Sequence, residues 1–279
     1  MMKVIEKIAE IKEQLTIQRN YRKSIILVPT MGALHEGHIA LINHAKKIAE
    51  IVVVSIFVNK AQFNNLEDFE KYPRNLLKDI EALKDCGVDY IFAPSHQEIF
   101  QEQNNFEINV LEIADCLCGK YRPKHFNGVA LIVSKLFNIV QPDHAIFGMK
   151  DFQQLLIIKK LVNDFNFPIK IHGYETVRNQ HGLALSSRNQ RLNNQQLTIA
   201  SNIFRILNEI KSDFRNNQNI LSQKKQELLA IGFEKVEYLE IRDENNLQLI
   251  DNFQINQSAR IFIAVYLQGV RLIDNLTVF

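Results

Sequence analysis

Apolar, strand-like segments alternate with amphipathic, helix-like segments between residues 24 and 174. A strand, a helix and a second strand in this order need a crossover connection, which gives a parallel sheet covered by helices. The pattern therefore predicts an α/β protein with a Rossmann-like, doubly wound parallel sheet, whose ligands bind at the carboxyl ends of the strands. In chain order the segments are Ser24–Val28, His38–Ala49, Ile51–Phe57, Arg74–Cys86, Tyr90–Phe92, Phe126–Val140, Ala145–Phe147, Asp151–Phe165 and Ile169–Tyr174.

The sequence changes in character after residue 174. A Gln- and Asn-rich helical segment, Asn193–Ser212, precedes three strand-like runs, and this order fits a smaller C-terminal α+β domain. The runs are Val236–Ile241, Ala259–Tyr266 and Val270–Val278. We expect two domains, residues 1–174 and residues 175–279.

Charge and hydropathy argue against two classes of partner. The chain has 33 Lys and Arg against 31 Asp and Glu, so its net charge of +2 gives no electrostatic case for nucleic acid or an anionic membrane. The longest strongly apolar run, Ile51–Val58, is too short to span a bilayer. Val4, Ile8, Ile11 and Leu15 recur at helical spacing, which predicts an amphipathic first helix rather than a signal peptide. We expect a soluble, cytoplasmic protein.

The three cysteines, Cys86, Cys116 and Cys118, form no Cys-x-x-Cys pair and have no partnering histidine cluster. They favour neither a disulfide framework nor a structural zinc site. We expect idle or buried thiols and no protein-built metal site.

Residues 31–38, Met-Gly-Ala-Leu-His-Glu-Gly-His, lie where the first strand should turn into a helix. His35 and His38 share one face of the first helical turn, and Gly37 between them leaves room for a ligand. Free backbone N–H groups at the helix start would add a partial positive charge there. These features predict a phosphate site, although an ordinary polar helix start has the same geometry.

Two further segments place polar side chains at the same edge of the sheet. Gln62 follows the second strand, and its amide can both donate and accept, which suits a substrate with a carboxylate beside a hydroxyl. Lys150 and Asp151 stand at a later strand-to-helix junction, where a cation favours phosphate, and Gln154 shares a helix face with Asp151. Asp151 would cap the helix or bind a ribose hydroxyl, and a solvated helix start is the structural alternative.

The third segment, Ser186-Ser187-Arg188, follows a loop marked by Gly182. Two hydroxyls and a guanidinium match phosphate oxygens, although the tripeptide alone has low specificity. Because no Ser, Cys or Asp nucleophile with a partnering base accompanies these cations, the substrate itself is the expected nucleophile. The pattern fits adenylyl transfer from ATP, with Mg²⁺ as the usual counter-charge.

The His-x-Gly-His signature resembles that of the nucleotidylyltransferase and class I aminoacyl-tRNA synthetase superfamily. Six blocks between residues 29 and 192 narrow this to a resemblance to the pantothenate synthetase family of pantoate–beta-alanine ligases. The blocks are Pro29-Thr30-Met31-Gly32-Ala33-Leu34-His35-Glu36-Gly37-His38, Phe57-Val58-Asn59 with Gln62-Phe63, Tyr72-Pro73-Arg74, Arg122-Pro123 with His125-Phe126, Phe147-Gly148 with Lys150-Asp151 and Gln153-Gln154, and Ser186-Ser187-Arg188-Asn189.

The resemblance implies a two-step reaction in which pantoate forms an adenylate with ATP and beta-alanine then displaces AMP. It assigns the chemistry to His38, assisted by His35, Lys150 and Arg188, and pantoate binding to Gln62 and Gln154, with Gln62 also near beta-alanine. Residues 1–174 would bind nucleotide and pantoate, residues 175–279 would carry the Ser-Ser-Arg loop, and the enzyme would be a homodimer. The implied ATP contacts are Met31, Gly32, Ala33, Leu34, His35, Glu36, Gly37, His38, Gly148, Met149, Lys150, Asp151, Val177, Leu185, Ser186, Ser187 and Arg188.

Four positions depart from the family pattern. Where the family usually has Pro, Gly, Glu and Met, this chain has Lys60, Lys124, Met149 and Leu185. We expect activity to survive, because Met149 and Leu185 would act mainly through their backbone.

Two other functions compete with this one. In a different adenylyl or cytidylyl transferase, a phosphate group of the second substrate would attack in place of a carboxylate. Such a substrate would need a further Arg or Lys cluster, and the expected pocket has two glutamines instead. A non-catalytic nucleotide-binding module would have little use for a full set of phosphate-facing cations.

Overall fold

The computed structural model describes residues 2–100, 106–215, 217, 219–250 and 258–278. The chain divides into two compact units. The first contains residues 1–111, 122–149 and 154–175, and the second contains residues 112–121, 150–153 and 176–279.

A six-stranded parallel sheet in the order β1-β4-β3-β2-β5-β6 forms the centre of the first unit. From β2 the chain builds outward through β3 and β4 on one side and then returns to β5 and β6 on the other. The carboxyl ends of β2 and β5 therefore flank the point where strand order reverses, the usual ligand site of such sheets. The strands are β1 (Lys3–Ile5), β2 (Ile25–Thr30), β3 (Ile51–Ile56), β4 (Tyr90–Phe92), β5 (His144–Gly148) and β6 (Lys170–Tyr174).

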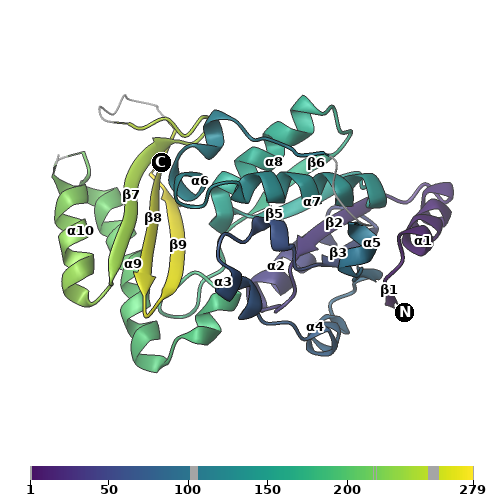
Figure 1. Cartoon of the computed structure of the whole chain (residues 1–279), viewed down its shortest axis with the longest axis horizontal. Helices are drawn as coiled ribbons and strands as arrows, with labels where there is room; N and C mark the ends of the chain where they lie inside the picture. Colours follow the sequence, from purple (N-terminus) through teal and green to yellow (C-terminus); the bar gives the residue numbers. More distant parts are fainter. Residues whose placement is uncertain (1, 101–105, 216, 218, 251–257, 279) are drawn as a thin grey trace. The chain divides into compact units, whose positions relative to one another are not determined.

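Both faces of this sheet are covered by apolar packing. Alternate residues such as Val28 and Val54 share one face and pack with α2 and α4, while the residues between them, such as Leu27 and Val53, are also fully buried. Figure 1 shows the long α7 in teal, and most of its residues are buried. The helices are α1 (Ile8–Asn20), α2 (Glu36–Ala45), α3 (Leu66–Glu70), α4 (Leu76–Leu83), α5 (His96–Ile99), α7 (His125–Val140) and α8 (Phe152–Asp164), with a 3-10 turn η1 (Lys60–Gln62).

The second unit contains an antiparallel sheet of β7 (Lys235–Asp243), β8 (Ala259–Leu267) and β9 (Val270–Thr277). One face, including Ile263 and Leu272, packs on α9 (Asn194–Asp213) and α10 (Ile220–Ile231), which lie beside the sheet in Figure 1. The other face contacts the short segments 112–121 and 150–153. These segments contain η2 (Glu112–Ala114), α6 (Leu117–Tyr121) and the end of η3 (Met149–Asp151).

Aromatic and sulfur contacts fix the short segments to that second face. The Phe152 ring lies 5.9 Å from the Phe262 ring, and the Cys118 thiol lies 3.1 Å from the Tyr238 hydroxyl. Burial raises the pKa of Tyr238 well above its usual value. Gln153 donates from Nε2 to the Ile113 carbonyl at 2.8 Å, so its amide is committed to holding this segment.

The predicted α/β class, with a doubly wound parallel sheet and a smaller α+β part, is confirmed. The first-helix prediction is partly wrong, because Val4 lies in edge strand β1 and the helix begins at Ile8. The predicted helix from Asp151 begins at Phe152, after a 3-10 turn. In the described part of the chain, no helix is long and apolar enough to cross a membrane.

Lys124 adopts a left-handed backbone conformation, with φ of +62°, as the residue before α7. A side chain at such a position clashes with the backbone, which is why glycine is favoured there. The departure from glycine at this position therefore costs stability.

We expect Lys124→Gly to raise the free energy of unfolding by about 1 kcal/mol or less, because relief of strain exceeds the extra entropy of the unfolded chain. Urea denaturation of both proteins measures the difference. A clear loss of stability would contradict this account. Lys120→Gly, within α6, is the control and should destabilise the protein by about 1 kcal/mol.

Candidate active site

The turn between β2 and α2 is held by side chains beneath it. Thr30 accepts from the Gly32 N–H at 3.2 Å and donates its hydroxyl to the Ser55 carbonyl at 2.8 Å. Gly32 has φ of +74°, and an added Cβ would lie 2.7 Å from a carboxylate oxygen of Asp79. Glycine is thus required both by backbone conformation and by close approach.

Asp79 on α4 is the main anchor of this turn. Its side chain accepts from the Ala33 N–H at 3.1 Å and from the Leu34 N–H at 2.8 Å. The residue is only 4% exposed, so these charge-assisted bonds are shielded from water. Sequence analysis did not identify Asp79, because a single carboxylate in an amphipathic helix resembles any solvated residue.

The rings of His35 and His38 cap the start of α2 by accepting hydrogen bonds from backbone N–H groups. Nδ1 of His35 accepts from the Gly37 N–H at 3.1 Å, and Nδ1 of His38 accepts from the His35 N–H at 3.2 Å. Their ring centroids lie 4.1 Å apart. A ring nitrogen accepts only when it carries no proton, so each neutral ring carries its proton on Nε2. Both rings are therefore fixed at the start of α2 by backbone hydrogen bonds to Nδ1.

Most of the backbone N–H groups that were expected to be free in this turn are engaged within the protein. The N–H groups of Ala33, Leu34, His35 and Gly37 all have acceptors within the protein, and the His38 N–H donates to the His35 carbonyl at 2.8 Å. The sequence pattern does not show this, because the acceptors are a remote carboxylate and the histidine rings themselves. Of the predicted residues in this turn, Glu36 is the exposed one.

Gln62 ends η1 directly after β3 and is buried, with 9% exposure. Its Nε2 lies 2.9 Å from the Met31 sulfur, so the structure brings the predicted pantoate residue to the predicted ATP turn. Its Oε1 accepts from Asn59 at 3.1 Å. Its backbone carbonyl accepts from Arg122 Nη2 at 3.2 Å and lies 2.7 Å from His125 Nδ1.

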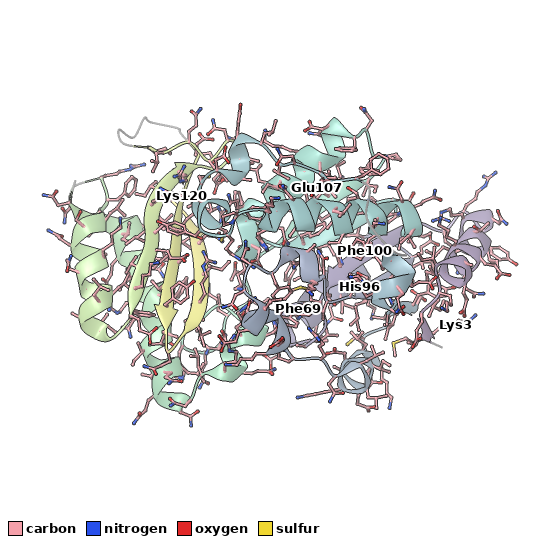
Figure 2. All side chains as sticks on the ribbon, in the orientation of Figure 1. Lys3, Phe69, His96, Phe100, Glu107 and Lys120 are labelled. Carbon is pink, nitrogen blue, oxygen red and sulfur yellow. The ribbon has the colours of Figure 1, made fainter. Side chains whose placement is uncertain are left out.

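Lys60, one of the departures, is exposed at the start of η1 and lies 5.9 Å from the Phe69 ring centre. Arg74 stacks on the same ring at 4.2 Å and donates to the Phe69 carbonyl at 2.7 Å. Figure 2 labels Phe69, which comes from α3. Phe63, next to Gln62, contacts this ring at 5.3 Å. The aromatic contact therefore supports the Gln62 turn without a proline at position 60.

The carboxyl end of β5 leads to Gly148 and Met149, also in the first unit. A Cβ on Gly148 would have no described heavy atom within 4 Å, so protein packing leaves this position open. Met149 packs toward Gly173 on β6. Gln154 lies half-buried in the first turn of α8.

The remaining predicted residues belong to the second unit. Lys150 is half-buried, its carbonyl accepts from Asn275 at 2.8 Å, and Asp151 is exposed. Val177 and Leu185 face each other across a narrow hairpin, in which the Leu185 N–H donates to the Val177 carbonyl at 3.0 Å.

Ser186, Ser187 and Arg188 form the start of the 3-10 turn η4 (Ser187–Arg191) rather than an open loop. The Ser186 hydroxyl caps this turn by accepting from the Arg188 N–H at 3.3 Å. Ser187 is buried and Arg188 is half-buried. The predicted site residues therefore divide between the units: the histidines, Gln62 and Gln154 lie in the first, and Lys150 and the Ser-Ser-Arg segment in the second.

A doubly wound sheet with a histidine-bearing turn at its switch point defines a nucleotide-binding type of α/β enzyme. The family model described as pantoate–beta-alanine ligase matches residues 3–277. A pantothenate synthetase of Acinetobacter baumannii is 45% identical over 281 residues, covering 99% of this chain and 98% of the relative.

Two solved structures of the same family are similar to this chain over its whole length. The pantothenate synthetase of Thermus thermophilus has a TM-score of 0.92 at 36% identity, covering 100% of both chains. The pantoate–beta-alanine ligase of Francisella tularensis, in complex with a βγ-ATP compound and beta-alanine, has a TM-score of 0.83 at 38% identity, covering 100% of this chain and 98% of that one. The chain is therefore an enzyme of the pantoate–beta-alanine ligase family.

We expect Asp79→Asn to destabilise the protein by about 1–3 kcal/mol. Each carboxylate oxygen of Asp79 accepts from one backbone N–H, and the asparagine amide would replace one of these oxygens with a nitrogen that cannot accept. Urea denaturation gives the change. Asp85→Asn is the control, since Asp85 is exposed, and it should change stability by about 0.5 kcal/mol or less. Equal effects of the two substitutions would show that the Asp79 contacts contribute nothing.

Proposed function

We propose that the protein condenses (R)-pantoate with beta-alanine at the expense of ATP, giving pantothenate, AMP and pyrophosphate through a pantoyl adenylate. The similarity to pantoate–beta-alanine ligases over residues 3–277 carries this proposal. The Francisella tularensis relative binds a βγ-ATP compound and beta-alanine, which supports the same substrates for this chain.

In the first step a pantoate carboxylate oxygen attacks the α-phosphorus of ATP, and the bond to the bridging oxygen breaks so that pyrophosphate leaves with the electron pair. In the second step the amine of beta-alanine attacks the acyl carbon of the adenylate, loses a proton and expels AMP. The enzyme supplies positioning and charge stabilisation rather than a nucleophile.

His38, assisted by His35, meets the charge that develops on the leaving phosphates. Because the Nδ1 atom of each ring is engaged by a backbone N–H, Nε2 is the atom that donates to phosphate oxygen. Lys150 and Arg188 are assigned the further positive charge that phosphate binding needs. The remaining proposed ATP contacts are Met31, Gly32, Ala33, Leu34, Glu36, Gly37, Gly148, Met149, Asp151, Val177, Leu185, Ser186 and Ser187.

Gln62 and Gln154 bind pantoate, and Gln62 also lies near the beta-alanine position. The Gln62 amide is held by Asn59 and Met31, which fixes its plane before substrate arrives. A fixed amide presents its donor and acceptor without the entropy cost of ordering a mobile side chain.

Mg²⁺ would accompany ATP. Among the described residues no group of three His, Cys, Asp or Glu side chains gathers as metal ligands, and both Asp79 oxygens are engaged by backbone N–H groups. This donor set fits an ion held mainly by phosphate oxygens and water, with the exposed Asp151 as an available carboxylate. The ion would neutralise phosphate charge.

The proposal includes the organisation expected from the sequence. Residues 1–174 act as the nucleotide- and pantoate-binding domain, and residues 175–279 bring the Ser-Ser-Arg segment. The enzyme works as a cytoplasmic homodimer.

Exchange of labelled pyrophosphate into ATP tests the reaction. We expect exchange that depends on pantoate and needs no beta-alanine, because the adenylate forms before the amine attacks. Exchange that depends instead on a nucleoside monophosphate or another phosphate substrate would identify a different transferase, and the absence of any exchange would overturn the adenylate step.

We expect His38→Ala to slow adenylate formation by about a hundredfold or more, because it removes a donor to the leaving group. Single-turnover measurement of pyrophosphate release with ATP and pantoate gives the rate. His44→Ala on the same helix is the control and should keep near-normal turnover. Near-normal turnover of the His38 variant would remove that residue from the chemistry.

A further inference from the structure

Two consecutive residues of β9, Asp274 and Asn275, point to opposite faces of the antiparallel sheet. Both are buried, at 3% exposure each. Asp274 interrupts a row of apolar residues that packs on α9, so its carboxylate needs a specific partner. Asn275 contacts one segment to which the proposed function assigns phosphate binding, and Asp274 is linked to another through Arg178.

Asp274 binds Arg178 with both oxygens. Arg178 Nη1 donates to Oδ2 at 2.5 Å, and Nη2 donates to Oδ1 at 2.9 Å. Burial raises the pKa of Asp274, and Arg178 opposes that rise. Since burying an ion pair usually brings little net stability, this pair is better explained by the geometry that it imposes.

Arg178 holds the hairpin that leads to the Ser-Ser-Arg segment. Its Nη1 also donates to the Gly182 carbonyl at 3.1 Å, and its guanidinium stacks on Phe204 at 4.0 Å. Residues 178 and 184 bridge across the hairpin, and Asn189 Nδ2 donates to the Ala184 carbonyl at 3.0 Å. Asp274 thus connects through a short chain of contacts to the turn that contains Ser186, Ser187 and Arg188.

Asn275 holds the other segment. Its Nδ2 donates to the Lys150 carbonyl at 2.8 Å, while its Oδ1 accepts from Arg260 Nη1 at 2.6 Å. Arg260 in turn pairs with Glu244 and stacks on Phe152. The amide is therefore fixed in one orientation, with its donor directed to the residue that supplies a proposed phosphate-binding cation.

We propose that Asp274 and Asn275 are positioning residues for ATP, which hold the Lys150 segment and the Ser-Ser-Arg turn at one spacing within the second unit. The inference rests on the proposed function for the roles of Lys150 and Arg188. A fixed spacing matters because a charge displaced by about 1 Å can cost a hundredfold in rate.

Asn275→Asp is the decisive variant, because it keeps the shape and an acceptor for Arg260 but removes the donor to Lys150. Asp274→Asn keeps the shape and removes the charge that holds Arg178. Glu237→Gln is the matched control, since the Glu237 side chain on β7 is 5% exposed and pairs with Arg271 of β9 at 2.7 Å, away from both phosphate segments.

Calorimetric titration with ATP and with AMP separates positioning from general structural damage. We expect Asn275→Asp to weaken ATP binding about tenfold while AMP, which lacks the β and γ phosphates, changes about twofold or less. We expect Asp274→Asn also to weaken ATP binding more than AMP binding. Glu237→Gln should leave the ratio of the two affinities unchanged. Equal losses for ATP and AMP with Asn275→Asp, or an unchanged ATP affinity, would overturn the inference.

The two half-reactions give a second readout. Asn275→Asp should slow adenylate formation about tenfold and leave the attack of beta-alanine on supplied pantoyl adenylate near the unmodified rate. An equal slowing of both steps would indicate a merely structural role. If the unmodified protein showed no pantoate-dependent exchange, the proposed function would fail, whereas the ATP and AMP titrations would still decide whether these residues position phosphate groups.

Discussion

The buried carboxylate of Asp79 organises the turn that carries His35 and His38. Without an acceptor for the Ala33 and Leu34 N–H groups, a turn with two successive residues at positive φ would leave polar groups unsatisfied in a shielded place. With it, the turn leads into a helix start at which His35 and His38 each accept a backbone hydrogen bond through Nδ1. A negative charge beneath the proposed phosphate site is compatible with that proposal, because both Asp79 oxygens already accept backbone hydrogen bonds.

In the second unit an antiparallel sheet, rather than a single carboxylate, holds separate segments of the chain in place. One face of β7–β8–β9 packs on two helices, as in any small α+β unit, but the other face holds residues 112–121 and 150–153, which come from earlier in the chain. A strand presents neighbouring side chains to opposite faces. Asp274 and Asn275 use this property to hold two separate segments from adjacent positions.

The fold was largely predictable, because strand and helix periodicities in residues 24–174 are regular and the crossover rules leave few arrangements. Strand β1 was not, since three residues before a helix carry too little pattern, and its Val4 fits the helical spacing. Among the candidate site residues, the two histidines and the Ser-Ser-Arg segment could be identified from the sequence, because their side chains are of the types that bind phosphate. Asp79 and Asn275 could not, because their importance arises from long-range contacts with backbone atoms, which the local sequence does not show.

The capping role of His35 has a consequence for which residues this position tolerates. Serine, asparagine or aspartate caps a helix at least as well as histidine. None of them, after accepting the Gly37 N–H, retains a second, rigidly directed N–H on the far side of a planar ring. A substitution that preserved only the cap of α2 would therefore remove the second ring nitrogen, through which the proposed function has His35 assist His38.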